Sequence, residues 1–208
     1  GVELIRGYAR FIDDHTLDID GKTVTAEKIL IATGGKPRRP NYEGAEHAIV
    51  SDDAFYLKEL PKHVVIEGAG YIAVEFAHIF HGMGAKVTVI YRGDSILRGF
   101  DAQISDFLAN EMKKQGINIE LGTNIIKITD KNDKKYVKTD KNNNIECDLV
   151  LSAIGRVPYT QDLRLENANI AYKDNGQIIV NEDYQTNVPN IYAAGDVTDR
   201  VNLTPVAL

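Results

Sequence analysis

A glycine-rich turn between two apolar runs is the feature that most constrains how this chain folds. The first run, Val64-Val65-Ile66, precedes Gly68-Ala69-Gly70-Tyr71-Ile72-Ala73, and a second run, 87–91, follows a segment with helical periodicity. This order of apolar residues and glycines is typical of a strand, a tight turn, a helix and a second strand. The pattern therefore predicts an α/β fold with a βαβ unit.

The chemistry of phosphate binding explains why glycines stand in this turn. A phosphate binds to N–H groups at a helix N-terminus and needs a path free of side chains. Gly68 permits the tight turn, Gly70 lets a diphosphate approach, and Ala73 lets the helix pack closely on the strand. We expect Gly68, Ala69 and Gly70 to bind a dinucleotide; the alternative is a glycine turn that binds nothing.

The residues after the second apolar run indicate which dinucleotide binds. About twenty residues after the glycines an NAD site carries an acid for the ribose hydroxyls, but this chain has Tyr91 there, followed by Arg92 and Arg98. Two guanidinium groups can clamp a 2′-phosphate through charge-assisted bonds worth about 1.5–3 kcal/mol each. The sequence predicts NADPH; the alternative is that both arginines are solvated loop residues.

Composition excludes several functional classes. The net charge of −6 disfavours a nucleic-acid partner, and no apolar run approaches the roughly 20 residues that span a bilayer. The only cysteine, Cys147, leaves no partner for an internal disulfide and fits a reducing compartment. No targeting pattern is visible, so we expect a cytoplasmic protein. The five histidines show no metal-ligand spacing with Cys147, and no metal is expected.

Shifts in pattern divide the chain into three blocks. Residues 1–34 predict strands, with a hairpin turn at Asp20-Gly21 and a strand that ends near Thr33. Residues 35–158 contain the glycine motif, and 159–208 return to short strands. The absence of an initial methionine suggests a fragment of a longer protein.

Together these motifs resemble the glutathione reductase branch of the FAD-dependent pyridine nucleotide–disulfide oxidoreductases, over essentially the whole chain. The segment 68–75, GAGYIAVE, is very similar to the NADPH motif of that branch, and Arg92 and Arg98 match its 2′-phosphate arginines. The other similar segments are 7–9, 31–35, 153–156, 194–196 and 203–207.

The resemblance implies a Rossmann-like NADPH-binding domain, 35–158, inserted into a partial FAD-binding domain of similar fold, 1–34 and 159–208. Both domains would be doubly wound. The FAD contacts implied are the backbone of Ala9 at the adenine, Asp196 on the ribityl chain, and Thr33 and Thr204. Gly155, at the end of the NADPH domain, is implied as a further cofactor residue.

The resemblance also implies catalytic roles. Tyr71 would cover the flavin until NADPH displaces it, and Glu75 would pair with a lysine near the flavin N5. Ile72 would line the nicotinamide pocket. Asn202 departs from a glutamate found in some relatives, so it receives no role.

The activity implied is the NADPH- and FAD-dependent reduction of glutathione disulfide by a homodimer. The first FAD motif and the redox-active cysteine pair are expected before Gly1, and the dimerisation domain after Leu208, so the chain alone would lack the machinery for catalysis. Trypanothione reductase and mercuric reductase are alternatives, and dihydrolipoamide dehydrogenase is disfavoured because it should carry an acid at Tyr91. A non-catalytic NADPH-binding module is the alternative from another class.

Overall fold

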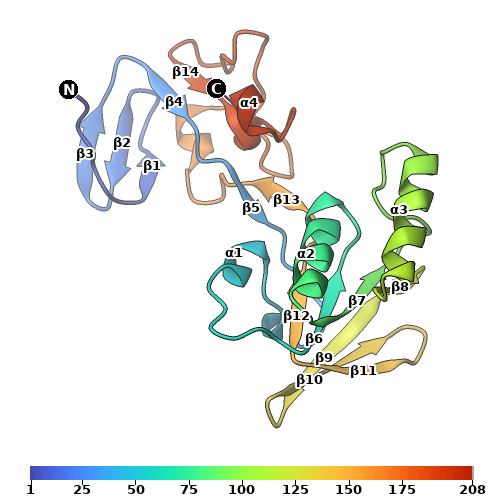
Figure 1. The fold of residues 1–208 in the computed structure, drawn as a ribbon. Helices are drawn as coiled ribbons and strands as arrows, with labels where there is room; N and C mark the ends of the chain where they lie inside the picture. Colours follow the sequence, from blue (N-terminus) through green and yellow to red (C-terminus); the bar gives the residue numbers. More distant parts are fainter. Residues whose placement is uncertain (208) are drawn as a thin grey trace. The chain divides into compact units, whose positions relative to one another are not determined.

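The computed structural model describes residues 1–207, which divide into two compact units (Figure 1). We call residues 37–155 the central unit. The residues up to 36 and from 156 onward form the other, which we call the terminal unit. Within residues 1–207 no helix is both long and apolar enough to cross a membrane.

A four-stranded parallel sheet forms the centre of the central unit, with strand order β12-β6-β7-β8. Its strands are β6 (His63–Glu67), β7 (Lys86–Tyr91), β8 (Asn118–Leu121) and β12 (Leu149–Ser152). The chain moves outward from β6 to β8 and then returns to the opposite side of β6. The direction of winding therefore changes between β6 and β12, and at such a point the carboxyl ends of the strands leave a crevice for a ligand.

The two faces of this sheet are covered by different layers. Val64 and Ile66 of β6 pack into the core beneath α2 (Tyr71–Gly82) and α3 (Ala102–Lys114) (Figure 1). Val65 points the other way, into a second core shared with the antiparallel sheet β11-β10-β9. That sheet consists of β9 (Ile125–Lys131), β10 (Lys134–Thr139) and β11 (Asn144–Cys147).

This second layer consists of strands and not of helices, and the expected α/β fold with a parallel sheet is confirmed. The segment between β8 and β12 forms three antiparallel strands instead of a crossover helix. Asn132 and Asp133 both adopt positive φ, 54° and 58°, which closes the β9–β10 hairpin in a tight turn.

A stripe of small and aromatic residues explains the packing of α2. Its buried residues are Ala73, Val74, Phe76, Ala77 and Phe80, at the spacing of one helical face. Ile79 and Met83 lie beside this stripe, so their side chains remain 49% and 61% exposed. In α3, Asp101 caps the N-terminus by accepting hydrogen bonds from the backbone N–H groups of Gln103 and Ile104.

The terminal unit contains three small sheets around its own core. The hairpin predicted at Asp20-Gly21 is confirmed, with φ of 48° and 91°. Among the short strands expected after residue 159, no strand forms at 177–180, where only Ile178 makes an isolated bridge. The strands are β1 (Ala9–Phe11), β2 (Thr16–Ile19), β3 (Lys22–Thr25), β4 (Ile29–Ile31), β5 (Gly35–Pro37), β13 (Arg156–Pro158) and β14 (Ile191–Ala193). The short helices of the whole chain are η1 (Ala45–His47), α1 (Ser51–Ala54), η2 (Leu165–Ala168), η3 (Gly195–Thr198) and α4 (Thr204–Ala207).

A substitution at Gly44 tests the contact between the loop before η1 and strand β9. Gly44 has φ of 77°, and a Cβ atom there would overlap the carbonyl oxygen of Ile128. We expect Gly44→Ala to lower the free energy of unfolding by about 2–4 kcal/mol, measured by urea denaturation. Gly82→Ala is the control, because a Cβ at the end of α2 meets nothing within 4 Å, and it should stabilise by up to about 1 kcal/mol. Equal stabilities for the two variants would contradict this packing.

Candidate functional site

A cavity of about 510 Å³ opens at the carboxyl ends of the parallel strands in the central unit. Three loops contribute to its wall: 68–72 after β6, 91–92 after β7 and 153–155 after β12. A second hollow of about 770 Å³ shares Tyr91, Arg92, Arg98 and Asn124 with it. This volume and position are typical of sites that bind nucleotides in α/β sheets.

The glycine turn is shaped by one close backbone approach and one open space. Gly68 has φ of 116°, and a Cβ there would clash with the carbonyl group of Ala153, so only glycine fits this position. Gly70 has an ordinary φ of −73°, and a Cβ there would meet nothing within 4 Å. The chain therefore does not need a glycine at position 70 for its own packing.

The N-terminus of α2 is open to a ligand. Gly70 is its N-cap residue and supplies no side-chain hydrogen bond to the first turn. The first N–H groups of a helix have no partner within the helix and carry a partial positive charge. These groups and the open space in front of Gly70 fit the diphosphate of a dinucleotide.

Arg92 and Arg98 both line this cavity with exposed side chains. Neither makes a hydrogen bond or an ion pair with any residue from 1 to 207. The N–H of Leu97 donates to the carbonyl oxygen of Ala69 at 2.7 Å, which ties the arginine loop to the glycine turn. The structure thus brings two unpartnered cations and the glycine turn to one cavity.

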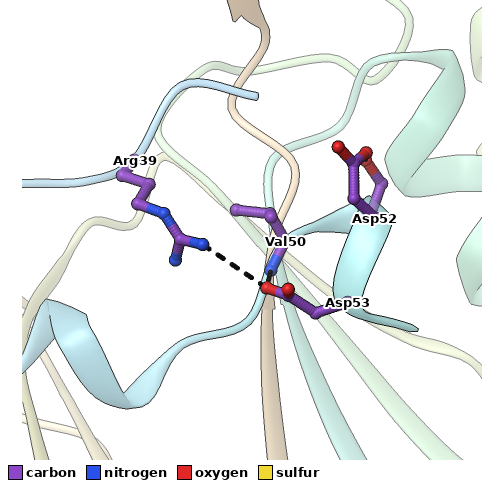
Figure 2. Close-up of polar contacts among 5 residues, drawn as sticks. Arg39, Val50, Asp52 and Asp53 are labelled. Atoms are coloured by element: carbon purple, nitrogen blue, oxygen red, sulfur yellow. Dashed lines mark hydrogen bonds and ion pairs between the residues drawn. The ribbon is translucent and has the colours of Figure 1, made fainter. Parts of the chain in front are cut away.

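Arg39, in the same unit, contrasts with Arg92 and Arg98 because its guanidinium forms an ion pair. Figure 2 shows its guanidinium directed at Asp53, with Nη2 3.5 Å from Oδ2. The same carboxylate oxygen accepts the backbone N–H of Val50 at 3.0 Å, at the start of α1. Arg39 has a structural role and does not line the cavity.

The remaining predicted residues of the central unit divide into two groups. Tyr71, Ile72 and Gly155 line the cavity together with Gly68, Ala69 and Gly70, and the Tyr71 side chain is half exposed. Glu75 lies one turn further along α2, exposed and outside the cavity lining. It has no hydrogen-bond or ion-pair partner among residues 1–207.

A separate hollow of about 320 Å³ lies in the terminal unit, between the ends of β4 and β14 and the start of α4. Asp196 and Thr204 line it. The Asp196 carboxylate accepts no hydrogen bond from residues 1–207 and is half-buried. An unpartnered carboxylate of this kind fits the hydroxyl groups of the FAD ribityl chain.

Ala9 and Thr33 lie outside this hollow. Ala9 begins β1 and pairs with Ile19, and the Thr33 hydroxyl donates to the carbonyl oxygen of Tyr159 at 2.8 Å. The structure therefore places Asp196 and Thr204 on one hollow, and Thr33 lies between two of its lining residues, Ala32 and Gly34.

Sequence reasoning missed a hydrogen-bonded group in the cavity wall. Glu67, the last residue of β6, accepts hydrogen bonds at Oε2 from the Tyr42 hydroxyl at 2.9 Å and the Ser152 hydroxyl at 3.0 Å. Burial is the main cause that raises the pKa of Glu67, and the two hydrogen bonds oppose it. Burial and the adjacent carboxylate likewise raise the pKa of Tyr42. The available signal was the position of Glu67 and Ser152 at the ends of neighbouring parallel strands.

The lone cysteine does not form part of the site. Cys147 ends β11 with a buried side chain, and burial raises the pKa of its thiol to about 12. A thiol of this kind stays protonated near neutral pH and is a poor nucleophile. No group of three or more metal-ligating side chains gathers anywhere in residues 1–207.

Comparison with known proteins identifies the family. The sequence profile of the pyridine nucleotide-disulphide oxidoreductases matches residues 1–208. The chain belongs to the pyridine nucleotide-disulphide oxidoreductase family. The family expected from the sequence motifs is thereby confirmed, and the cavity described above is the candidate nucleotide site of this family member.

The relatives of this oxidoreductase chain include glutathione reductases from several organisms. The whole of this chain aligns with glutathione reductase of Nostoc sp. at 44% identity, and the alignment covers 48% of that reductase. The chain is 44% identical to the chloroplastic/mitochondrial glutathione reductase of Pisum sativum, of which it covers 38%. Trypanothione reductase of Trypanosoma congolense is 45% identical over 88% of the chain and 38% of that protein.

A solved structure shows the same fold. The HOCl-induced flavoprotein disulfide reductase RclA from Escherichia coli matches 99% of this chain with a TM-score of 0.94 and 35% identity. The chain covers 48% of that structure. It therefore spans about half the length, or less, of these relatives.

Proposed function

We propose that this chain is the central nucleotide-binding portion of an NADPH- and FAD-dependent enzyme that reduces glutathione disulfide. The observation that carries the proposal is the pair of unpartnered arginines, Arg92 and Arg98, on the cavity that also contains the glycine turn. Family membership and the glutathione reductases among the relatives support the reaction class.

The residues of the central unit would hold NADPH in three ways. The N–H groups at the start of α2 and the open space at Gly70 would receive the diphosphate. Arg92 and Arg98 would bind the 2′-phosphate, and their reach into a partly enclosed cavity strengthens the attraction. Ala69, Ile72 and Gly155 would line the nucleotide site and exclude water. When bound, NADPH supplies a hydride and FAD relays the electrons to a disulfide.

The terminal unit would hold part of FAD. Asp196 would accept hydrogen bonds from the ribityl hydroxyls, which fits its lack of a partner among residues 1–207. Thr204 lines the same hollow at the start of α4. We assign the backbone of Ala9 and the strand end at Thr33 to the same cofactor on the family resemblance alone.

Two side chains of α2 carry the proposed catalytic roles. Tyr71 has a half-exposed ring at the edge of the cavity, and we propose that it shields the flavin and moves aside as NADPH enters. Glu75 is exposed and unpartnered within residues 1–207, which leaves its carboxylate free to orient the lysine that the family resemblance places near the flavin N5.

The wider properties of the protein follow from the same resemblance. We propose domains at 1–34 with 159–208 for FAD and 35–158 for NADPH, a homodimer, and a cytoplasmic location. The name of the pea relative places that protein in chloroplasts and mitochondria, so relatives of this chain work in more than one compartment.

Trypanothione disulfide is the second candidate substrate. It is supported by the trypanothione reductase of Trypanosoma congolense, which is as similar to this chain as the glutathione reductases are. Steady-state assays of the purified full-length protein with each disulfide separate the two candidates. Glutathione disulfide should be reduced with the higher kcat/KM, and the opposite order would favour trypanothione.

The two arginines set the nucleotide preference in this proposal. Replacing Arg92 and Arg98 together by alanine removes about two charge-assisted bonds, so the ratio of kcat/KM for NADPH over NADH should fall by about a hundredfold. Steady-state kinetics with both nucleotides measure this ratio. Arg39→Ala is the matched control, because this arginine is paired with Asp53 and lies outside the cavity, and its ratio should stay at the parent value. An unchanged ratio in the double variant would refute the assignment.

Gly70 tests whether the open space at the start of α2 belongs to the nucleotide. Gly70→Ala places a methyl group where nothing lies within 4 Å, so the free energy of unfolding should change by no more than about 1 kcal/mol. The Kd for NADP⁺ should nevertheless rise about tenfold or more because the diphosphate loses its approach. Gly68→Ala serves as the contrast, since its clash with Ala153 should destabilise the fold itself. Tight NADP⁺ binding by Gly70→Ala would disprove this use of the space.

A further inference from the structure

Glu67 is a carboxyl group in a cavity that is otherwise arranged for a polyanion. It lines the cavity next to Gly68, and it is the only carboxyl group among the described residues that do so. Nothing in the proposed binding of NADPH uses this side chain. A dinucleotide with a diphosphate and a 2′-phosphate brings several negative charges into the same partly enclosed space.

The two oxygens of Glu67 have different surroundings. Oε2 accepts both hydrogen bonds, from the hydroxyls of Tyr42 and Ser152. Oε1 has no partner within residues 1–207. Oε1 also retains some exposure to solvent. Within residues 1–207 the one side-chain nitrogen or oxygen that is both fully buried and without a partner is Ser105 Oγ, so an unpartnered Oε1 cannot be fully buried. Oε1 is therefore the oxygen that is open to an incoming ligand.

The protonation state decides what Oε1 does to that ligand. A carboxylate can only accept hydrogen bonds and repels phosphate, whereas a protonated carboxyl is neutral and donates one. None of the cations that line the cavity neutralises Glu67, since Arg38, Arg92 and Arg98 make no ion pair or hydrogen bond with it. The other ionisable groups of the lining are Tyr42, Tyr71 and Tyr91.

We propose that Glu67 binds the nucleotide in its protonated form, so that NADPH or NADP⁺ takes up a proton at this carboxyl when it enters the cavity. This inference rests on the proposed function, because it needs the nucleotide in this cavity. Burial, which raises the pKa of the free Glu67 carboxyl, already favours the protonated form. The bound nucleotide raises that pKa further by like-charge repulsion.

The direction of the pH dependence follows from linkage. Below the pKa that Glu67 has in the free protein, its carboxyl is protonated in both the free and the nucleotide-bound protein. The affinity for NADP⁺ is then greatest. The affinity for NADP⁺ declines as the pH rises from the pKa of Glu67 in the free protein to its higher pKa in the bound protein. Above both pKa values the affinity becomes constant. Glu67→Gln keeps a neutral side chain at every pH, so it should bind NADP⁺ about tenfold more tightly than the parent protein at pH 8.

Isothermal titration with NADP⁺ tests this inference on the purified protein. Titrations between pH 5 and 8, in buffers of different ionisation enthalpy, give the number of protons taken up. The 2′-phosphate of the ligand itself titrates near pH 6, but it contributes equally to parent and variant, so their difference reports Glu67. We expect the parent to take up more protons than Glu67→Gln in this range, and the two affinities to converge toward pH 5.

Two further variants complete the design. Glu120→Gln removes a carboxylate from β8 outside the cavity and should behave as the parent does. Tyr42→Phe removes a donor to the Glu67 carboxylate, which raises the pKa of Glu67, so proton uptake should move to higher pH. Tyr42→Phe also provides the test if Glu67→Gln fails to fold.

The outcomes separate the two proposals. Equal proton uptake and parallel pH profiles in the parent and Glu67→Gln, with NADP⁺ bound by both, would overturn the role of Glu67 and leave the NADPH site intact. Absence of NADP⁺ binding to the parent protein would overturn the proposed function and this inference together. A greater uptake by the parent supports both.

Discussion

The close approach of Gly68 to the carbonyl group of Ala153 is the constraint on which the candidate site depends. It brings the end of β6 against the end of β12, at the point where the parallel sheet changes its direction of winding. A side chain at position 68 would push these two strand ends apart. Because the backbone of Ala69 also accepts the N–H of Leu97, the same turn positions the loop that carries Arg98.

Electrostatics then give this backbone arrangement its selectivity. The start of α2 attracts negative charge through its free N–H groups, and Arg92 and Arg98 add two full positive charges that no carboxylate within residues 1–207 neutralises. Among the described residues that line the cavity, Glu67 is the one that carries a carboxyl group. Its burial raises the pKa of its carboxyl, and its two hydroxyl partners oppose that rise. In the proposed function the two arginines would hold phosphate, and Glu67 would bind the same ligand in its protonated form.

The parts of the structure that the sequence predicts well are those set by local patterns. The glycine turn, α2 and β7 follow from residues adjacent in the chain, and the arginines follow from their distance after the turn. The way in which β9–β11 pack on Val65 and Ile90 depends on contacts between segments distant in the chain, and no local pattern predicts it. Glu67 was missed because its partners lie 25 and 85 residues away.

A comparison of two ligands that differ only in one phosphate tests the central claim most directly. ADP-ribose and its 2′-phosphate lack the nicotinamide, so their affinities report the adenosine end of the cavity alone. Titration of the purified protein should show that the 2′-phosphate form binds at least about a hundredfold more tightly, as two charge-assisted bonds require. Equal affinities would contradict the assignment of Arg92 and Arg98 to the phosphate, and with it the preference for NADPH.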